Sequence, residues 1–147
     1  MSNANLVKLN IPASMKFLNV VSASIAAILE HLSIAGDVET AIYEIQLAVH
    51  EICTNIIEHA YGNDPEKRID LEIFIKQRAD SSLVIKLYDY SGIEFIAANV
   101  KAPVVEALQE RGMGLMLINQ IMDEVDYAFQ DNRNCWTLVK KFIQAEA

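Results

Sequence analysis

Two adjacent segments in the middle of the chain alternate between apolar and polar side chains. The odd positions from Ile69 to Ile75 are all isoleucine or leucine, and residues 83–87 repeat the pattern after an expected turn at Asp80-Ser81. Such alternation predicts strands with one buried and one wet face, which is typical of an antiparallel sheet. A sheet of this kind needs a second layer on its apolar side, and the rest of the chain must supply it.

Helical periodicity precedes these strands. From Ser14 the apolar residues are three or four positions apart, and Gly36 and Asp37 are suited to end this helix and to cap the next one. The second helix is the longest predicted element and runs to about Tyr61. The turn-forming sequence Gly62-Asn63-Asp64-Pro65 stops it there.

The remaining predicted elements are shorter. They are strands over residues 6–11, 125–129 and 135–143, a helix over 112–123, a turn over 131–134, and a loop over 90–111 with a short helix after Pro103. Helices placed before and among antiparallel hairpins indicate an α+β two-layer sandwich. Residues 1–147 are predicted to form one domain.

Composition excludes several classes of function. The chain carries 20 acidic and 12 basic residues, a formal charge of −8, with no lysine or arginine cluster, which argues against nucleic acid or an anionic membrane as the main partner. No apolar run reaches the about 18 residues of a transmembrane helix. Cys53 and Cys135 are too few and too far apart for a disulfide framework or a zinc site. Two scattered thiols fit a reducing compartment, so a cytoplasmic location is expected.

Glu51 and Asn55 are four positions apart, so they lie one turn apart on the same side of the long helix. A solvated polar face explains this spacing as well as a functional site does. On the functional interpretation, the carboxylate and the amide oxygen point together at a metal-bound phosphate. Magnesium suits such a place, because it takes few protein oxygens and keeps several waters.

Two further segments have both a structural and a functional interpretation. Asp89 ends a strand, either as part of a simple turn or as a solvent-accessible carboxylate that accepts a hydrogen bond from a base such as adenine. The sequence Arg111-Gly112-Met113-Gly114 opens a helix, whose first N–H groups can hold a phosphate. It is neither a Walker A loop nor a Rossmann fingerprint.

In chain order, these signals resemble the motifs of the histidine-kinase-like ATPases. The stretch from Glu51 to Tyr61, with its His-Ala-Tyr ending, resembles the N box. Asp89-Tyr-Ser-Gly92 resembles the first glycine box, and Arg111-Gly-Met-Gly114-Leu the second. Within that superfamily the chain is most similar to the anti-sigma-factor serine kinases, and the match covers nearly the whole domain.

The resemblance implies a Bergerat-type fold, a mixed and mostly antiparallel sheet packed on helices, with ATP and Mg²⁺ as cofactors. It assigns Mg²⁺ coordination to Asn55, the general base to Glu51 and the adenine contact to Asp89. The other nucleotide-binding positions that it implies are Gly92, Arg111, Gly112, Gly114 and Thr137, the last as a support for Asp89 through water.

The implied function is an ATP-dependent serine/threonine-protein kinase that phosphorylates a small anti-anti-sigma-type antagonist protein and binds a sigma factor as a dimer. Two alternatives stay open: a non-catalytic ATP-binding module that regulates a partner by contact alone, and a phosphatase or ATPase with no protein acceptor. One departure bears on the choice. The family usually has glycine two residues after the adenine-binding Asp, where this chain has Ser91. If that position needs a positive φ, serine costs about 1 kcal/mol or more there and favours the binding module.

Overall fold

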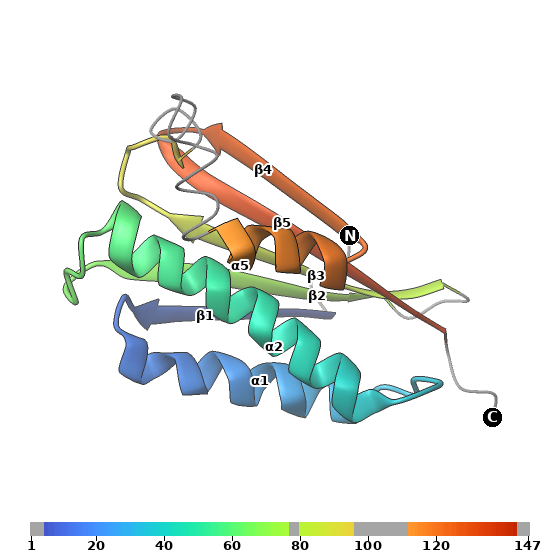
Figure 1. Ribbon diagram of the computed structural model, residues 1–147. Helices are drawn as coiled ribbons and strands as arrows, with labels where there is room; N and C mark the ends of the chain where they lie inside the picture. Colours follow the sequence, from blue (N-terminus) through green and yellow to red (C-terminus); the bar gives the residue numbers. More distant parts are fainter. Residues whose placement is uncertain (1–4, 77–79, 96–111, 144–147) are drawn as a thin grey trace.

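The computed structural model describes residues 5–76, 80–95 and 112–143 (Figure 1). Its elements are β1 (Leu6–Pro12), the 3-10 turn η2 (Met15–Phe17), α1 (Leu18–Glu30), α2 (Val38–Asn55), the π-helical segment η3 (Ile56–Ala60), β2 (Arg68–Lys76), β3 (Asp80–Asp89), α5 (Gly112–Ile121), β4 (Glu124–Gln130) and β5 (Arg133–Ile143). The predicted α+β two-layer sandwich is confirmed.

The five described strands form one sheet in the order β1-β2-β3-β5-β4. All four pairings are antiparallel, so this part of the chain holds an antiparallel sheet rather than a mixed one. Helices α1, α2 and α5 lie together on one face of the sheet, with α2 between the other two (Figure 1). Among the described residues, no helix is long and apolar enough to cross a membrane.

The core lies between the helices and the apolar face of the sheet. Ile69, Leu71 and Ile73 of β2 are buried there, as the alternation predicts. The central helix α2 contributes Ile45 and Ile52, both completely inaccessible to solvent. Burying a side chain of this size stabilises the fold by about 1.5–3 kcal/mol. The opposite face of the sheet carries no helix in the described part of the chain (Figure 1).

Helix α2 begins and ends at defined signals. The Asp37 side chain accepts a hydrogen bond from Thr40 N at 3.1 Å, which confirms the predicted cap, and the bonds from Thr40 lower the pKa of the Asp37 carboxyl. After Asn55 the helix widens, and Tyr61 N donates to Ile56 O, five residues back, at 3.0 Å. The helical path thus reaches the predicted end near Tyr61, but its last turn is π-helical.

Two of the predicted turns are placed differently in the structure. Asp80 and Ser81 belong to β3, where Asp80 pairs with Ile143. The β4–β5 turn is only two residues long, because Asp131 and Asn132 both have positive φ, 56° and 61°, as a type I′ hairpin requires. The rest of the predicted turn over 131–134 is therefore strand β5. The short helix expected after Pro103 lies outside the described residues.

Candidate functional site

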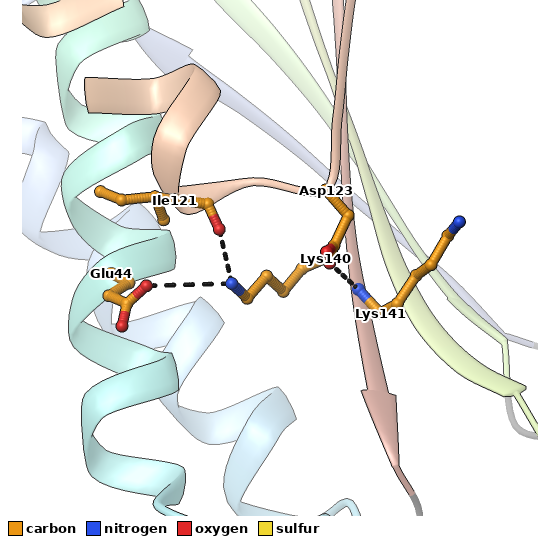
Figure 2. A network of polar contacts seen from close by, with 5 residues as sticks. All are labelled: Glu44, Ile121, Asp123, Lys140 and Lys141. Carbon is orange, nitrogen blue, oxygen red and sulfur yellow. Dashed lines mark hydrogen bonds and ion pairs between the residues drawn. The ribbon is translucent and has the colours of Figure 1, made fainter. Parts of the chain in front are cut away.

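The three sequence motifs meet at one end of the molecule. Figure 1 shows that the C-terminal end of α2, the end of β3 and the beginning of α5 all lie there. The orientation of α5 follows from Lys140 at its far end. The Lys140 ammonium donates to the Ile121 carbonyl at 2.5 Å and lies 3.8 Å from Glu44 of α2 (Figure 2). Because Glu44 lies in the first half of α2, the two helices run antiparallel, and Gly112 is directed toward the Asn55 end.

Tyr61 joins the helix layer to the sheet at this end. Its hydroxyl donates to the Arg68 carbonyl at the start of β2 and accepts from Tyr90 N just beyond β3, both at 2.7 Å. Burial raises the pKa of this phenol to about 12, so the hydroxyl keeps its proton at physiological pH. One side chain therefore fixes the distance between the end of the α2–η3 helical path and Asp89, the residue before Tyr90.

Asp89 is buried, with only 2% of its surface exposed, so the expectation of a solvent-accessible carboxylate is wrong. Its Oδ1 accepts three hydrogen bonds, from Ser91 N at 3.1 Å, Ser91 Oγ at 2.8 Å and Asn134 Nδ2 at 3.0 Å. Its Oδ2 accepts none from the described residues. One oxygen thus holds the carboxylate in place and the other is left as an acceptor.

The turn after Asp89 accommodates serine without strain. The positive φ falls on Gly92, at 74°, and Ser91 is not among the described residues with positive φ. A Cβ at Gly92 would approach Asn132 Nδ2 to 3.2 Å, so this position disfavours a side chain for two reasons. Ser91 instead uses its N–H and hydroxyl to hold Asp89. The cost expected at Ser91 is therefore absent.

Thr137 does not contact Asp89. It pairs with Lys86, whereas Asp89 pairs with Asn134, and residues at odd separation on a strand face opposite sides of the sheet. Thr137 thus lies on the helix-free face, where its hydroxyl is 3.9 Å from Cys135 Sγ. The side chain that supports Asp89 is Asn134, which lies in β5 rather than in the turn that the sequence predicts. The pair Asp131-Asn132 is suited to a two-residue hairpin turn, and this signal in the sequence would place Asn134 on the following strand.

Glu51 and Asn55 lie on the C-terminal half of α2, and both are partly exposed. Neither side chain forms a hydrogen bond or ion pair with a described residue. Cys53, between them, faces the core, where burial raises the pKa of its thiol to about 12. The two polar side chains are therefore separated from the apolar stripe of the helix, and no described residue stands between them and a ligand.

A metal ion at this end would have one amide oxygen from the described residues, that of Asn55. This oxygen is a hard ligand that has no partner in the described part of the chain, and it fits Mg²⁺ that is otherwise held by phosphates and water. In the described part of the chain, no three His, Cys, Asp or Glu side chains gather into a metal-binding group.

Gly112 and Gly114 form the first turn of α5. The N–H groups of a first helical turn have no partner within the helix, and they carry the positive end of the helix dipole. They face the same end of the molecule as Asn55 and can hold an anion there. Arg111, predicted to lie near the phosphates, is outside the described residues.

This arrangement was compared with known domain families. Residues 11–140 match the histidine kinase-like ATPase domain. The chain belongs to this family. The resemblance to the histidine-kinase-like ATPases is thereby confirmed, and in this ATPase domain the three sequence motifs that suggested it lie at one end of the fold.

Curated relatives of this chain include serine-protein kinases RsbW. Those of Bacillus thuringiensis strain Al Hakam and Bacillus cereus strain 03BB102 are each 30% identical to this chain over 149 residues, covering 95% of it and 86% of the relative. The relative from Bacillus anthracis strain CDC 684 is 29% identical with the same coverage. Among solved structures, a chain of the SiaB–SiaC complex from Pseudomonas aeruginosa matches with a TM-score of 0.57 and 17% identity, covering 94% of this chain and 91% of that one. This last likeness supports the fold.

Proposed function

We propose that this ATPase domain is a serine/threonine-protein kinase that transfers the γ-phosphoryl group of ATP to a small regulatory protein. The observation that carries the proposal is the placement of two polar side chains, Glu51 and Asn55, that have no partner among the described residues. They lie at the same end of the molecule as Oδ2 of Asp89, which accepts no hydrogen bond from a described residue either. A binding module needs the carboxylate of Asp89 for the base, but it has no use for a free carboxylate beside the metal ligand. The names of the curated relatives support the same activity.

Each residue has one task on this proposal. Oδ2 of Asp89 accepts a hydrogen bond from the adenine amino group, while Gly92 lets the chain turn beside it. Asn55 holds Mg²⁺, which neutralises charge on the phosphates when it is bound. The N–H groups at Gly112 and Gly114 hold phosphate oxygens.

Glu51 acts on the acceptor rather than on the nucleotide. The γ-phosphoryl group leaves the oxygen that joins it to ADP and bonds to the serine or threonine hydroxyl oxygen of the partner. The hydroxyl proton passes to the Glu51 carboxylate. Phosphoryl transfer depends mainly on positioning and charge neutralisation, so a base one helical turn from Asn55 completes the set of groups that the reaction needs.

The partner proposed is a small anti-anti-sigma-type antagonist, with a sigma factor as a second partner bound by a homodimer. The cytoplasm is the proposed location, because the chain keeps two free thiols, Cys53 and Cys135. Ser91 does not favour a non-catalytic binding module, because the positive φ falls on Gly92 and serine causes no strain.

The test is Glu51→Ala, assayed with labelled ATP and candidate antagonist proteins. Phosphorylation should fall about 100-fold or more, because a general base contributes typically 10²–10⁴-fold to the rate. ATP affinity should stay within a few-fold of wild type. Glu39→Ala, at the other end of α2, is the matched control and should phosphorylate normally. Full activity of Glu51→Ala would remove the base from the proposal, and a wild-type protein that binds ATP but phosphorylates no candidate would indicate a binding module.

A further inference from the structure

Asn134 is completely buried, and it uses all of its hydrogen-bonding capacity. Its Nδ2 donates to Asp89 Oδ1 at 3.0 Å and to the Ile93 carbonyl at 2.7 Å. Its Oδ1 accepts from Phe95 N at 3.1 Å and from the Tyr127 hydroxyl. An amide has two N–H donors and one oxygen with two lone pairs, so nothing is left unused.

These partners fix which way the amide points. The Ile93 carbonyl can only accept and the Phe95 N–H can only donate, so Nδ2 must lie on the side of Ile93 and of the Asp89 carboxylate. A buried network in which every group is satisfied holds its members rigidly. The amide therefore offers Asp89 a donor in a fixed direction.

The same amide also ties down the chain after the glycine turn. Ile93 and Phe95 both bind Asn134 through their backbones, and the Phe95 ring packs against Trp136 with ring centres 5.3 Å apart. Ser91, at the start of this segment, binds the same Oδ1 of Asp89 that Asn134 binds. Asp89 and the segment 91–95 are thus held through one side chain.

We propose that Asn134 is a positioning residue for nucleotide binding. By occupying Oδ1 of Asp89 it keeps Oδ2 directed to the base, and by binding Ile93 and Phe95 it sets the turn that borders the base. This inference rests on the proposed role of Asp89, and it adds a residue from another strand that was not expected in the site.

The sharpest test is Asn134→Asp, measured by calorimetric titration with ADP and Mg²⁺ between pH 5 and 8. The variant keeps the size of the side chain but replaces the donor by a carboxylate about 3 Å from Asp89, and two such groups cannot both ionise easily. Among the described residues, the titratable groups in contact with this amide are Asp89 and Tyr127, and Tyr61 interacts with Asp89. Burial raises the pKa of Tyr61 to about 12, so Tyr61 does not titrate over this range. Affinity should fall at least tenfold at pH 8. It should recover partly toward pH 5, where a shared proton restores a donor.

Three further measurements accompany this titration. Asn134→Ala lacks both donor and charge, so its affinity should be reduced without recovery at low pH. Thr137→Val, on the same strand but the opposite face, should bind as wild type does. In the wild-type protein, the side-chain amide resonances of Asn134 should shift when ADP and Mg²⁺ are added, while those of the exposed Asn10 should not. This last measurement needs no variant to fold.

The outcomes separate this inference from the proposed function. If Asp89→Asn weakens ADP binding but Asn134→Asp binds as wild type at every pH, or the Asn134 resonances do not shift, the role of Asn134 is overturned and the function stands. If wild type and Asp89→Asn bind ADP equally, the nucleotide site itself is placed wrongly.

Discussion

Tyr61 and Tyr90 are joined by one hydrogen bond where the helix layer meets the sheet, with Tyr90 N donating to the Tyr61 hydroxyl at 2.7 Å. The same hydroxyl donates to the Arg68 carbonyl. The phenol of Tyr61 thus serves two backbone groups, one in β2 and one just beyond the end of β3. This explains in physical terms why the motif ends on tyrosine rather than on another aromatic residue.

Tyr61→Phe removes both hydrogen bonds while keeping the ring. It leaves a backbone donor and a backbone acceptor without their partner, so the free energy of unfolding should fall by about 1–3 kcal/mol. Urea unfolding measures this change. Tyr43→Phe is the control, because Tyr43 is 64% exposed and its loss of a hydroxyl should change the unfolding free energy by less than about 0.5 kcal/mol. Equal losses in the two variants would contradict the bracing role.

Asn55→Ala should abolish the enhancement of nucleotide binding by magnesium. No described side chain occupies the Asn55 amide, so its removal deprives the metal of a ligand and leaves the protein's own contacts intact. Titration of ADP with Mg²⁺ and again with EDTA gives the enhancement in each protein. The same enhancement in wild type and Asn55→Ala would show that the metal does not bind here.

Asp89→Asn should weaken nucleotide binding by about 5- to 150-fold, which corresponds to about 1–3 kcal/mol for one lost acceptor. The substituted amide can keep its oxygen toward Ser91 and Asn134, and it then turns an NH₂ group toward the base where Oδ2 was. Circular dichroism should therefore show a normal fold. An unfolded variant would mean that the charge at Asp89, rather than the geometry, holds the network.

Stability should decrease above pH 9 in part because of Cys53. Burial raises the pKa of its thiol from 9.0 to about 12, so up to pH 9 the thiol is protonated in both states and its contribution is fully present. Between pH 9 and 12 the unfolded thiol ionises and the folded one does not, which lowers the unfolding free energy by about 1.4 kcal/mol per pH unit. Cys53→Ala should lose less stability than wild type over this range. Parallel curves for the two proteins would refute the assignment.

Most of the fold could be predicted from the sequence, because its signals are local. The alternation from Ile69 to Ile75 and the Asp37 cap each depend on residues a few positions apart, and both are confirmed. The placement of Asp89 at a strand end was predicted in the same way. Its burial was not, because burial depends on what a distant strand and the following turn bring to it.

The predictions for the site that are wrong result from small shifts in position along the chain. A turn assigned two residues too long left Asn134 outside the sheet. Thr137 lies on the correct strand but on the wrong face of the sheet, because successive side chains along a strand point to opposite faces. The cost assigned to Ser91 assumed the spacing of other members of the family, whereas here the positive φ moves one residue on, to Gly92.

The π-helical segment between Asn55 and Tyr61 has a consequence for the length of the motif. A π turn uses one residue more than an α turn for about the same rotation. A chain with one residue fewer between these two positions, and a regular α-helix there, would present an amide and a phenol in nearly the same directions. A single-residue deletion in this stretch is thus a change that the fold can absorb, because the asparagine and the tyrosine keep nearly the same orientation.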